Sequence, residues 1–494
     1  MDFVYNGADS DDAIDKVFNK KRANDRKVWL EAYDKEAFLD TTRASVRYEE
    51  FLNNEMIHFS TYDCARSIPN MVDGLKISLR KILFAAFKRR LTAEIKVAQF
   101  SGYVSEHSAY HHGEASLNGA IVGMAQTFVG SNNINLLEPN GQFGTRLHGG
   151  DDSASERYIF TQLSPVARKL FPEADDAVLT YLNDDGTMVE PEFYVPIIPF
   201  ALVNGISGIG TGFSSNIPSY NPIQIIAYLR AKLSGAVYSA DFVPYYKGFK
   251  GTVVKGEGER FVVRGVFVKT GEDKLRITEL PVGTWTMPYI AFLEELVVNK
   301  LIKDFVSIST EVVVDITVSF LPGKLATTTD DEIVKMLKLS ATVSNTNMHM
   351  FNQDCRLCRY TSVPEIIGAF YDVRMRLYEK RKAFLETELR KQLRKLSNRA
   401  RYINETLADT IDLRRKTAAQ VGELLIAGKY DTYDEDFKYL TKMPMDSVSV
   451  ENVAVINRER DACAKELEDL VATSLSQMWL NELAVLEKEL LRTK

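Results

Sequence analysis

Apolar residues recur at intervals of three and four along several stretches of the chain, and this spacing predicts amphipathic helices. One stripe lies between residues 75 and 87, and its members are Leu75, Leu79, Ile82, Leu83 and Phe87. Lys76, Arg80, Lys81 and Lys88 fall outside the stripe, so a helix here would bury one face and present cations on the other. That arrangement is typical of the recognition helix of a helix-turn-helix or winged-helix fold.

The C-terminal part repeats this spacing over much longer runs. Residues 362–365 read Ser-Val-Pro-Glu, a capping box with proline in the first turn, and they predict the start of a helix. Apolar residues then recur at coiled-coil spacing through residues 385–407 and again through residues 453–490. The second run can return antiparallel to the first, with residues 422–445 as a globular tip between them. The sequence therefore predicts a long antiparallel coiled-coil arm.

The middle of the chain is richer in strand signals. Residues 251–254, 260–264 and 311–320 are dominated by β-branched and aromatic residues, and a charged turn follows the first of them. Before this region, helical spacing alternates with glycine-rich turns, and the first residues predict short helices with a mixed-charge surface. We therefore predict a multidomain α+β protein. Its expected domains are residues 1–45, 46–165, 166–360 and 361–494.

The composition fits a protein of several domains. With 494 residues the chain is too long for one core, and 45% hydrophobic and 26% charged residues are ordinary values. No apolar stretch reaches the length of a membrane span, so we expect no membrane partner. Four cysteines in so long a chain favour a reducing compartment. Cys355 and Cys358 form a single C-x-x-C pair without the second pair that a zinc site needs, so we interpret them as ordinary thiols and expect no metal ligands.

Charge is local in this chain. The formal net charge of −6 argues against a uniformly basic nucleic-acid binder. Residues 66–96 nevertheless contain eight basic residues and two acidic ones. Such a segment can neutralise several phosphates, although most runs of this kind are solvated helix surfaces.

The strongest candidate for chemistry is Tyr158. It directly follows Arg157 and comes shortly after a stretch rich in glycine, histidine and arginine. A phenol has a pKa of about 10, so it must be activated before it attacks a phosphodiester, and a cation must stabilise the developing charge. A guanidinium offers a planar fork of donors to phosphate oxygens. The Arg-Tyr pair alone is weak, because a half-buried structural tyrosine is the more common case.

A series of further motifs occurs in a fixed order around this pair. In the first half of the chain they are residues 66–76, 96–99, 110–114, 130–133, 141–150 and 157–160. The later ones are residues 196–199, 204–205, 208–212, 277–281, 284–286 and 344–347. Together these segments closely resemble the DNA breakage-reunion region of type IIA DNA topoisomerases of the eukaryotic and large-DNA-virus kind. The resemblance covers nearly the whole chain and is densest over residues 66–218.

The resemblance implies a role for specific residues. Tyr158 would be the nucleophile that forms a 5′-phosphotyrosyl link, and Arg157 would stabilise the transition state. Ile209, which lies within a Gly-Ile-Gly-Thr-Gly run, would insert into the base stack and bend the duplex. The implied DNA-binding residues are Arg66, Lys76, Arg80, Lys81, Lys96, His111, His112, Gln142, Arg146 and His148.

The resemblance also assigns the expected domains. Residues 1–45 would be the C-terminal tail of a Toprim-like region, and residues 46–165 a winged-helix DNA-gate domain. Residues 166–360 would be the tower domain, and residues 361–494 the coiled-coil arm with the C-gate tip, where two subunits meet. The chain would act on double-stranded DNA as a homodimer.

The resemblance implies two cofactors. The Glu-Gly-Asp and Asp-x-Asp-x-Asp motifs that hold Mg²⁺ in the family do not occur here, and neither does a glycine-rich ATP site. Mg²⁺ and ATP would therefore bind to other parts of the enzyme. We expect a nuclear location for a cellular protein, and the virion or host cytoplasm for a viral one.

Two other functions remain open at this stage. A tyrosine recombinase also combines a tyrosine nucleophile with arginine and histidine, but it needs no metal and has no tower or coil arm. A winged-helix and coiled-coil protein that only bends DNA would form no covalent adduct. Metal dependence, the polarity of the DNA link and the presence of an adduct separate the three.

Overall fold

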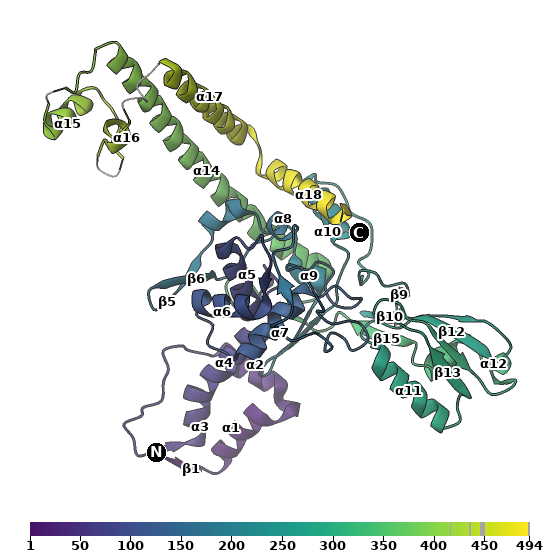
Figure 1. Ribbon diagram of the computed structural model, residues 1–494. Helices are drawn as coiled ribbons and strands as arrows, with labels where there is room; N and C mark the ends of the chain where they lie inside the picture. The colour runs from purple at the N-terminus through teal and green to yellow at the C-terminus, as the bar shows by residue number, and fades with distance from the viewer. Residues whose placement is uncertain (415, 434–435, 445–449, 493–494) are drawn as a thin grey trace. The chain divides into compact units, whose positions relative to one another are not determined.

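The computed structural model describes residues 1–414, 416–433, 436–444 and 450–492. The chain divides into two compact units (Figure 1). The first comprises Met1–Arg374 with Glu482–Lys494, and the second comprises Met375–Asn481. Helices and sheets both contribute, as the α+β prediction requires. Among the described residues, no helix combines the length and apolar character needed to cross a membrane.

The first unit begins with short helices, in agreement with the sequence. They are α1 (Ala8–Phe18), η1 (Lys20–Arg22) and α2 (Ala23–Glu31), and β1 (Asp2–Val4) pairs in parallel with β2 (Ser45–Arg47). A continuous helical segment follows, made of α3 (Tyr48–Phe51), η2 (Leu52–Met56) and α4 (Ile57–Ser67). Its middle part, η2, is a π-helix, which accommodates one residue more than a regular helical turn.

Three helices form the centre of the first unit. They are α5 (Ile77–Arg89), α6 (Val97–Ser108) and α7 (Glu114–Ala125), and the short strands β3 (Ile95–Lys96) and β4 (Phe160–Thr161) pair beside them. Four of the five predicted stripe residues lie on α5, because Leu75 precedes it, and the expected single buried face is wrong. Every residue from Ile82 to Phe87 is buried, because α6 and α7 both pack against this helix.

A series of short elements connects this centre to the β-rich part. They are α8 (Ala167–Leu170), η3 (Glu173–Val178), β5 (Tyr181–Asp184), β6 (Thr187–Pro191), α9 (Phe200–Asn204), β7 (Ile206–Ile209), β8 (Ser214–Ile217) and α10 (Pro222–Leu233). The pairs β5–β6 and β7–β8 are hairpins. A third hairpin, β16 (Met348–Phe351) with β17 (Leu357–Tyr360), follows the β-rich part.

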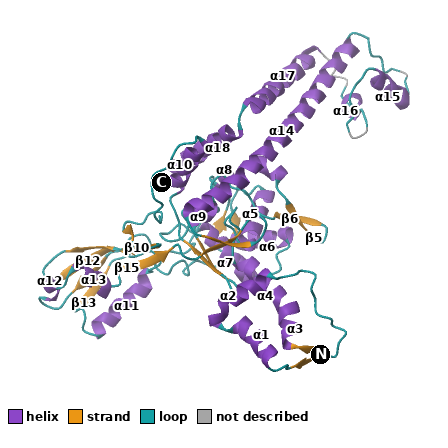
Figure 2. Ribbon diagram, turned by 180° about the vertical axis from the view of Figure 1, so that it is seen from behind, coloured by secondary structure: helices purple, strands orange, loops and turns teal. Residues whose placement is uncertain are grey.

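Two antiparallel sheets make up the β-rich part, and Figures 1 and 2 show their strands gathered together with α11 beside them. The first sheet has the order β15 (Ser340–Ser344), β10 (Arg260–Arg264), β9 (Thr252–Lys255). The second has the order β11 (Val266–Lys269), β12 (Lys274–Glu279), β14 (Ile316–Ser319), β13 (Asp304–Ser307). The helices here are α11 (Thr286–Val298), α12 (Lys324–Thr327) and α13 (Asp330–Met336). Buried residues of β12, β14 and α11 share one core, which includes Ile277, Ile316 and Leu293.

Long helices dominate the C-terminal part of the chain. They are α14 (Val363–Leu407), α17 (Val450–Ala472) and α18 (Leu475–Arg492), and α15 (Ala418–Ala427) and α16 (Lys438–Thr441) lie between α14 and α17. Within the second unit α17 runs back along α14 (Figures 1 and 2). The Lys382 ammonium donates to the Val471 carbonyl at 3.0 Å, and Ile403 shares an apolar cluster with Ile456, so the two helices are antiparallel.

Candidate active site

The turn that carries Tyr158 leads into β4, and backbone hydrogen bonds from α6 hold it in place. The Ala98 N–H donates to the Glu156 carbonyl at 3.1 Å, and the Val97 N–H donates to the Ile159 carbonyl at 3.0 Å. These two bonds come from the first turn of α6 and fix the backbone on both sides of the tyrosine. The sequence motif at residues 96–99 therefore positions the turn that contains the predicted nucleophile.

Tyr158 projects into solvent from this fixed turn. Its side chain is 75% exposed, whereas its neighbour Ile159 is 1% exposed and anchors the turn in the core. Arg157 is also exposed, and within the described part of the chain no carboxylate forms an ion pair with it. Glu156 accepts a hydrogen bond from the Ser155 hydroxyl instead, at 3.3 Å. An anchored backbone with two exposed functional side chains suits attack on a large substrate.

The glycine-rich loop before the turn is tightly packed. A Cβ atom added to Gly149 would lie 2.3 Å from the indole nitrogen of Trp285, so only glycine fits there. Asp152 accepts from the Thr145 backbone N–H at 2.8 Å and from its hydroxyl at 2.6 Å. Two predicted binding residues of this loop, Gln142 and His148, have exposed side chains.

The two histidines contact different elements, His112 the helix α4 and His111 the strand β5. The Tyr62 hydroxyl is 2.7 Å from Nε2 of His112, and His111 is 3.6 Å from the Asp184 carboxylate. Partial burial and the charge of Arg66 lower the pKa of His112, which favours its neutral imidazole. A neutral ring can offer one donor and one acceptor, which suits hydrogen bonding more than charge neutralisation.

Three of the predicted DNA-binding cations face outward. Arg66 and Lys96 are exposed, and Lys76 is half-buried beside the start of α5. Burial lowers the pKa of Lys76. The Lys96 ammonium lies 5.9 Å from the centre of the Phe160 ring, next to the Tyr158 turn.

Three other predicted cations face inward, and direct DNA contact does not fit their surroundings. Arg80 is 6% exposed and binds both carboxylate oxygens of Asp73, at 2.7 and 3.1 Å. Lys81 donates to the Glu190 carboxylate at 2.8 Å and to the Ser108 carbonyl. Arg146 is 5% exposed and binds Glu279 at 2.6 Å. These buried ion pairs hold the protein together, because a charge removed from water needs a partner charge.

Ile209 stands at the end of β7 with its side chain 83% exposed. Its hairpin is fastened to α4, since Asp63 accepts from the Thr211 backbone N–H at 2.8 Å and from its hydroxyl at 3.0 Å. The glycines on both sides of Ile209 allow the hairpin to approach α4 closely. A Cβ atom on Gly208 would lie 2.1 Å from the Ser67 carbonyl oxygen, and one on Gly210 would lie 3.0 Å from the Cys64 Cα atom. The exposed Ile209 is thus carried by a hairpin that is anchored to α4.

The C-x-x-C pair does not form a disulfide. Cys355 and Cys358 are free, and burial raises the pKa of both thiols. Across the described residues, no three His, Cys, Asp or Glu side chains come together as metal ligands.

Sequence reasoning missed the contribution of α4. This helix presents Tyr62 to His112 and Asp63 to the Ile209 hairpin, and it carries Arg66 in its last turn. The partners His112 and Thr211 lie 50 and 148 residues further along the chain, so residue spacing carried no signal for them.

Comparison with protein-family models gives two matches. Residues 66–484 match the DNA gyrase/topoisomerase IV family, in its A-type subunit. Residues 1–64 match the C-terminal associated domain of TOPRIM.

Relatives and solved structures agree with these matches. The chain is 41% identical to DNA topoisomerase 2 of Arabidopsis thaliana, over 99% of this chain and 36% of the relative. It is 45% identical to DNA topoisomerase 2 of Bombyx mori, over 86% of this chain and 29% of the relative. The crystal structure of the Plasmodium falciparum topoisomerase II DNA-binding, cleavage and re-ligation domain superposes with a TM-score of 0.90 at 38% identity, over 99% of this chain and 71% of that chain. The chain thus spans about a third of the length of the curated relatives it matches.

Proposed function

Because this chain belongs to the type IIA DNA topoisomerase family, we propose that it is the DNA cleavage and religation core of an enzyme that changes DNA topology. Two copies would each cut one strand of a duplex, a second duplex would pass through the break, and the cut strands would then be resealed. The observation that carries this proposal is the exposed Tyr158, held on a fixed turn beside an exposed arginine.

The chemistry follows from the two exposed side chains. The Tyr158 oxygen forms a bond to a backbone phosphorus while the bond from phosphorus to the 3′ oxygen breaks. The proton lost by the phenol is balanced by the proton gained at the 3′ oxygen. Arg157 donates to the phosphate oxygens, where negative charge develops. The protein–DNA ester conserves the bond energy, so the reverse reaction reseals the strand.

Arg66, Lys76, Lys96, His111, His112, Gln142 and His148 would bind the DNA around the reacting phosphate. Contacts to the DNA backbone give affinity and position the duplex, but they discriminate little between base sequences. Ile209 would insert between base pairs and bend the duplex, which its exposed apolar side chain on a clamped hairpin supports.

The domains keep the roles that the resemblance implied. Residues 46–165 would be the winged-helix DNA gate and residues 166–360 the tower. Residues 361–494 would be the coiled-coil arm and C-gate, which the antiparallel packing of α14 and α17 supports. Residues 1–45 would be the tail of a Toprim-like region, and the TOPRIM-associated match supports this role but extends further, to residue 64.

Mg²⁺ and ATP enter this proposal as requirements of the whole enzyme. The described residues do not fit an Mg²⁺ site, because no three potential ligand side chains come together among them. The ligands for Mg²⁺ and the ATP site would belong to other parts of the enzyme. For a cellular enzyme of this kind, the nucleus is the expected location.

A denaturing gel of covalent protein–DNA adduct tests the proposal. The chain is assayed together with its metal-binding part, with and without Mg²⁺, as wild type and as Tyr158→Phe. We expect a metal-dependent adduct that carries the DNA 5′ end and is lost in Tyr158→Phe. A metal-independent adduct at the 3′ end would indicate recombinase chemistry instead. DNA binding without any adduct would leave a DNA-bending scaffold and reject the catalytic role.

The proposed homodimer is tested separately. Sedimentation equilibrium of the same protein should give twice the mass of one chain. A monomer at all concentrations would contradict the two-subunit mechanism.

A further inference from the structure

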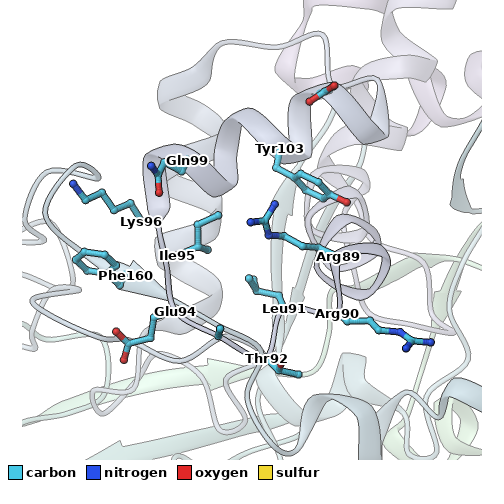
Figure 3. A pocket seen from close by; sticks show the side chains of 12 residues that line it. Arg89, Arg90, Leu91, Thr92, Glu94, Ile95, Lys96, Gln99, Tyr103 and Phe160 are labelled. Carbon is cyan, nitrogen blue, oxygen red and sulfur yellow. The ribbon is translucent and has the colours of Figure 1, made fainter.

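The chemistry proposed for Tyr158 leaves one neighbouring pocket without a role. This pocket has a volume of 710 Å³ and lies between the end of α5, the loop after it, β3 and the first half of α6, with Phe160 at one side (Figure 3). Ligand sites commonly measure about 300–1,000 Å³. The polar groups that line it include three cations, Arg89, Arg90 and Lys96, and the amide of Gln99.

Arg89 is held by an aromatic stack rather than by a carboxylate. Its guanidinium carbon lies 4.9 Å from the centre of the Tyr103 ring, and that ring is stacked on His107 with the centres 3.9 Å apart. A contact of this kind positions a guanidinium while its N–H groups stay available for an anion. Among the described residues, no carboxylate forms an ion pair with Arg89 or Lys96.

Acidic side chains also lie near this group. Glu94 and Glu106 line the pocket, and Glu173 pairs with Arg90 at its rim, so the three cations face an equal number of carboxylates. In Figure 3 the Glu94 carboxylate lies below the Phe160 ring and points away from Arg89. Arg90 points outward at the rim, where Glu173 is 3.5 Å away and both side chains are exposed. Exposed pairs of this kind are weak and can open for another anion.

The pocket is joined to the nucleophile turn by backbone pairing. Lys96 on β3 is paired with Phe160 on β4, two residues after Tyr158. The first N–H groups of α6, at Val97 and Ala98, are already bound to the carbonyls of Ile159 and Glu156. The helix N-terminus is therefore occupied, and an anion in this pocket would be held by side chains.

We propose that this pocket binds a second backbone phosphate of the cleaved duplex, distinct from the one that Tyr158 attacks. Arg89, Lys96 and the Gln99 amide donate to the phosphate, and Arg90 adds charge at the rim. The inference rests on the proposed function, because it needs the duplex to lie across the Tyr158 turn. It assigns Arg89 and Arg90, which sequence reasoning did not single out, to DNA binding.

The first test measures how DNA affinity depends on salt. The full chain binds a short duplex over a range of salt concentrations, as wild type, Arg89→Gln, Arg89→Lys and Lys88→Gln. Lys88 is the matched control, because it is an exposed cation next to Arg89 that does not line the pocket. The plot of log affinity against log salt has a negative slope. We expect Arg89→Gln to make this slope shallower by about 0.9, the value for one phosphate contact. Arg89→Lys should keep most of the slope, and Lys88→Gln should match wild type.

The second test locates the phosphate. Single neutral methylphosphonates are placed in turn along the duplex, and binding is compared between wild type and Arg89→Gln. One position other than the cleaved phosphate should weaken binding of wild type several-fold and weaken binding of Arg89→Gln clearly less, because the contribution of Arg89 at that phosphate is already lost in the variant. Equal sensitivity of the two proteins at every position would overturn the proposal. Competition by inorganic phosphate that needs Arg89, without any such position, would identify a free-anion site and overturn it too. If wild type binds no duplex, the proposed function itself fails.

Discussion

At the scale of single residues, the ion pair of Arg80 with Asp73 shows that Arg80 stabilises the fold, whereas exposed cations are the ones proposed to bind DNA. Asp73 also accepts hydrogen bonds from the backbone N–H groups of Leu75 and Tyr194, both at 3.0 Å. Asp73→Asn would leave the buried guanidinium without a counter-charge, so we expect a loss of about 3–5 kcal/mol in the free energy of unfolding. Urea denaturation measures this loss.

Arg66→Gln is the control for that prediction. Arg66 is exposed, so its substitution should change the free energy of unfolding by less than about 0.5 kcal/mol while it weakens DNA binding. Equal stability losses in Asp73→Asn and Arg66→Gln would contradict the division between the two kinds of cation.

The lowered pKa of His112 gives a pH dependence. Folding disfavours the protonated imidazole, so its contribution to stability is complete above the ordinary histidine pKa of about 6.5 and is lost as the pH falls below it. We expect wild type to lose stability relative to His112→Gln between about pH 7.5 and pH 5.5. Urea denaturation of both proteins at the two pH values measures the change. A pH-independent difference would show that His112 titrates normally.

The residue scale also shows how far sequence reasoning reaches. Tyr158 and Ile209 were singled out from motifs, and the exposure of both side chains is compatible with the proposed roles, which stay predictions. Lys81 and Arg146 looked equally suitable as DNA-binding cations. Their carboxylate partners lie 109 and 133 residues away in the chain, so local sequence could not indicate that they face inward.

At the scale of elements, the hairpin that carries Ile209 depends on Asp63. Asp63→Ala removes both hydrogen bonds to Thr211 and should let the hairpin move, since bonds to a charged acceptor contribute about 1.5–3 kcal/mol each. If Ile209 bends the duplex, energy transfer between dyes at the two DNA ends should report a smaller bend in Asp63→Ala, as in Ile209→Ala. Asp63→Asn keeps an acceptor oxygen and should bend DNA nearly as well as wild type. An unchanged bend in Asp63→Ala would mean that the glycine contacts alone hold the hairpin.

Element boundaries were harder to predict than element types. The strand expected over residues 311–320 is confined to Ile316–Ser319, because residues before it form a turn closed by a 2.8 Å bond from the Thr310 N–H to the Val313 carbonyl. The second C-terminal apolar run is interrupted between α17 and α18. There the Ser474 hydroxyl accepts from the Gln477 N–H at 3.1 Å and caps a new helix. Apolar spacing continues across such a cap, so it does not reveal the break.

At the scale of the whole molecule, the two compact units should respond separately to core substitutions. Ile403 is fully buried in the cluster shared by α14 and α17, and Leu293 is fully buried in the β-rich core of the first unit. Ile403→Ala should destabilise the second unit by about 2–5 kcal/mol, and Leu293→Ala should destabilise the first by a similar amount. Calorimetry should show each substitution shifting a different transition. A single transition shifted by both would indicate that the units unfold together.

The division into units was also beyond the reach of sequence patterns. The helices α14 and α18 each continue across the boundary between Arg374 and Met375 or between Asn481 and Glu482. Helical spacing is continuous there, and only contacts between distant parts of the chain define the units.

The π-helical turn Leu52–Met56 determines where the chain can change in length. In a regular α-helix, loss of one residue rotates everything before it by about 100° about the helix axis. A π-helical turn already holds one residue more than an α-helical turn, so loss of a residue there restores regular geometry and leaves the two flanks facing as before. We expect single-residue deletions to be tolerated within Leu52–Met56 and not within α4, where they would turn Tyr62 and Asp63 away from His112 and Thr211.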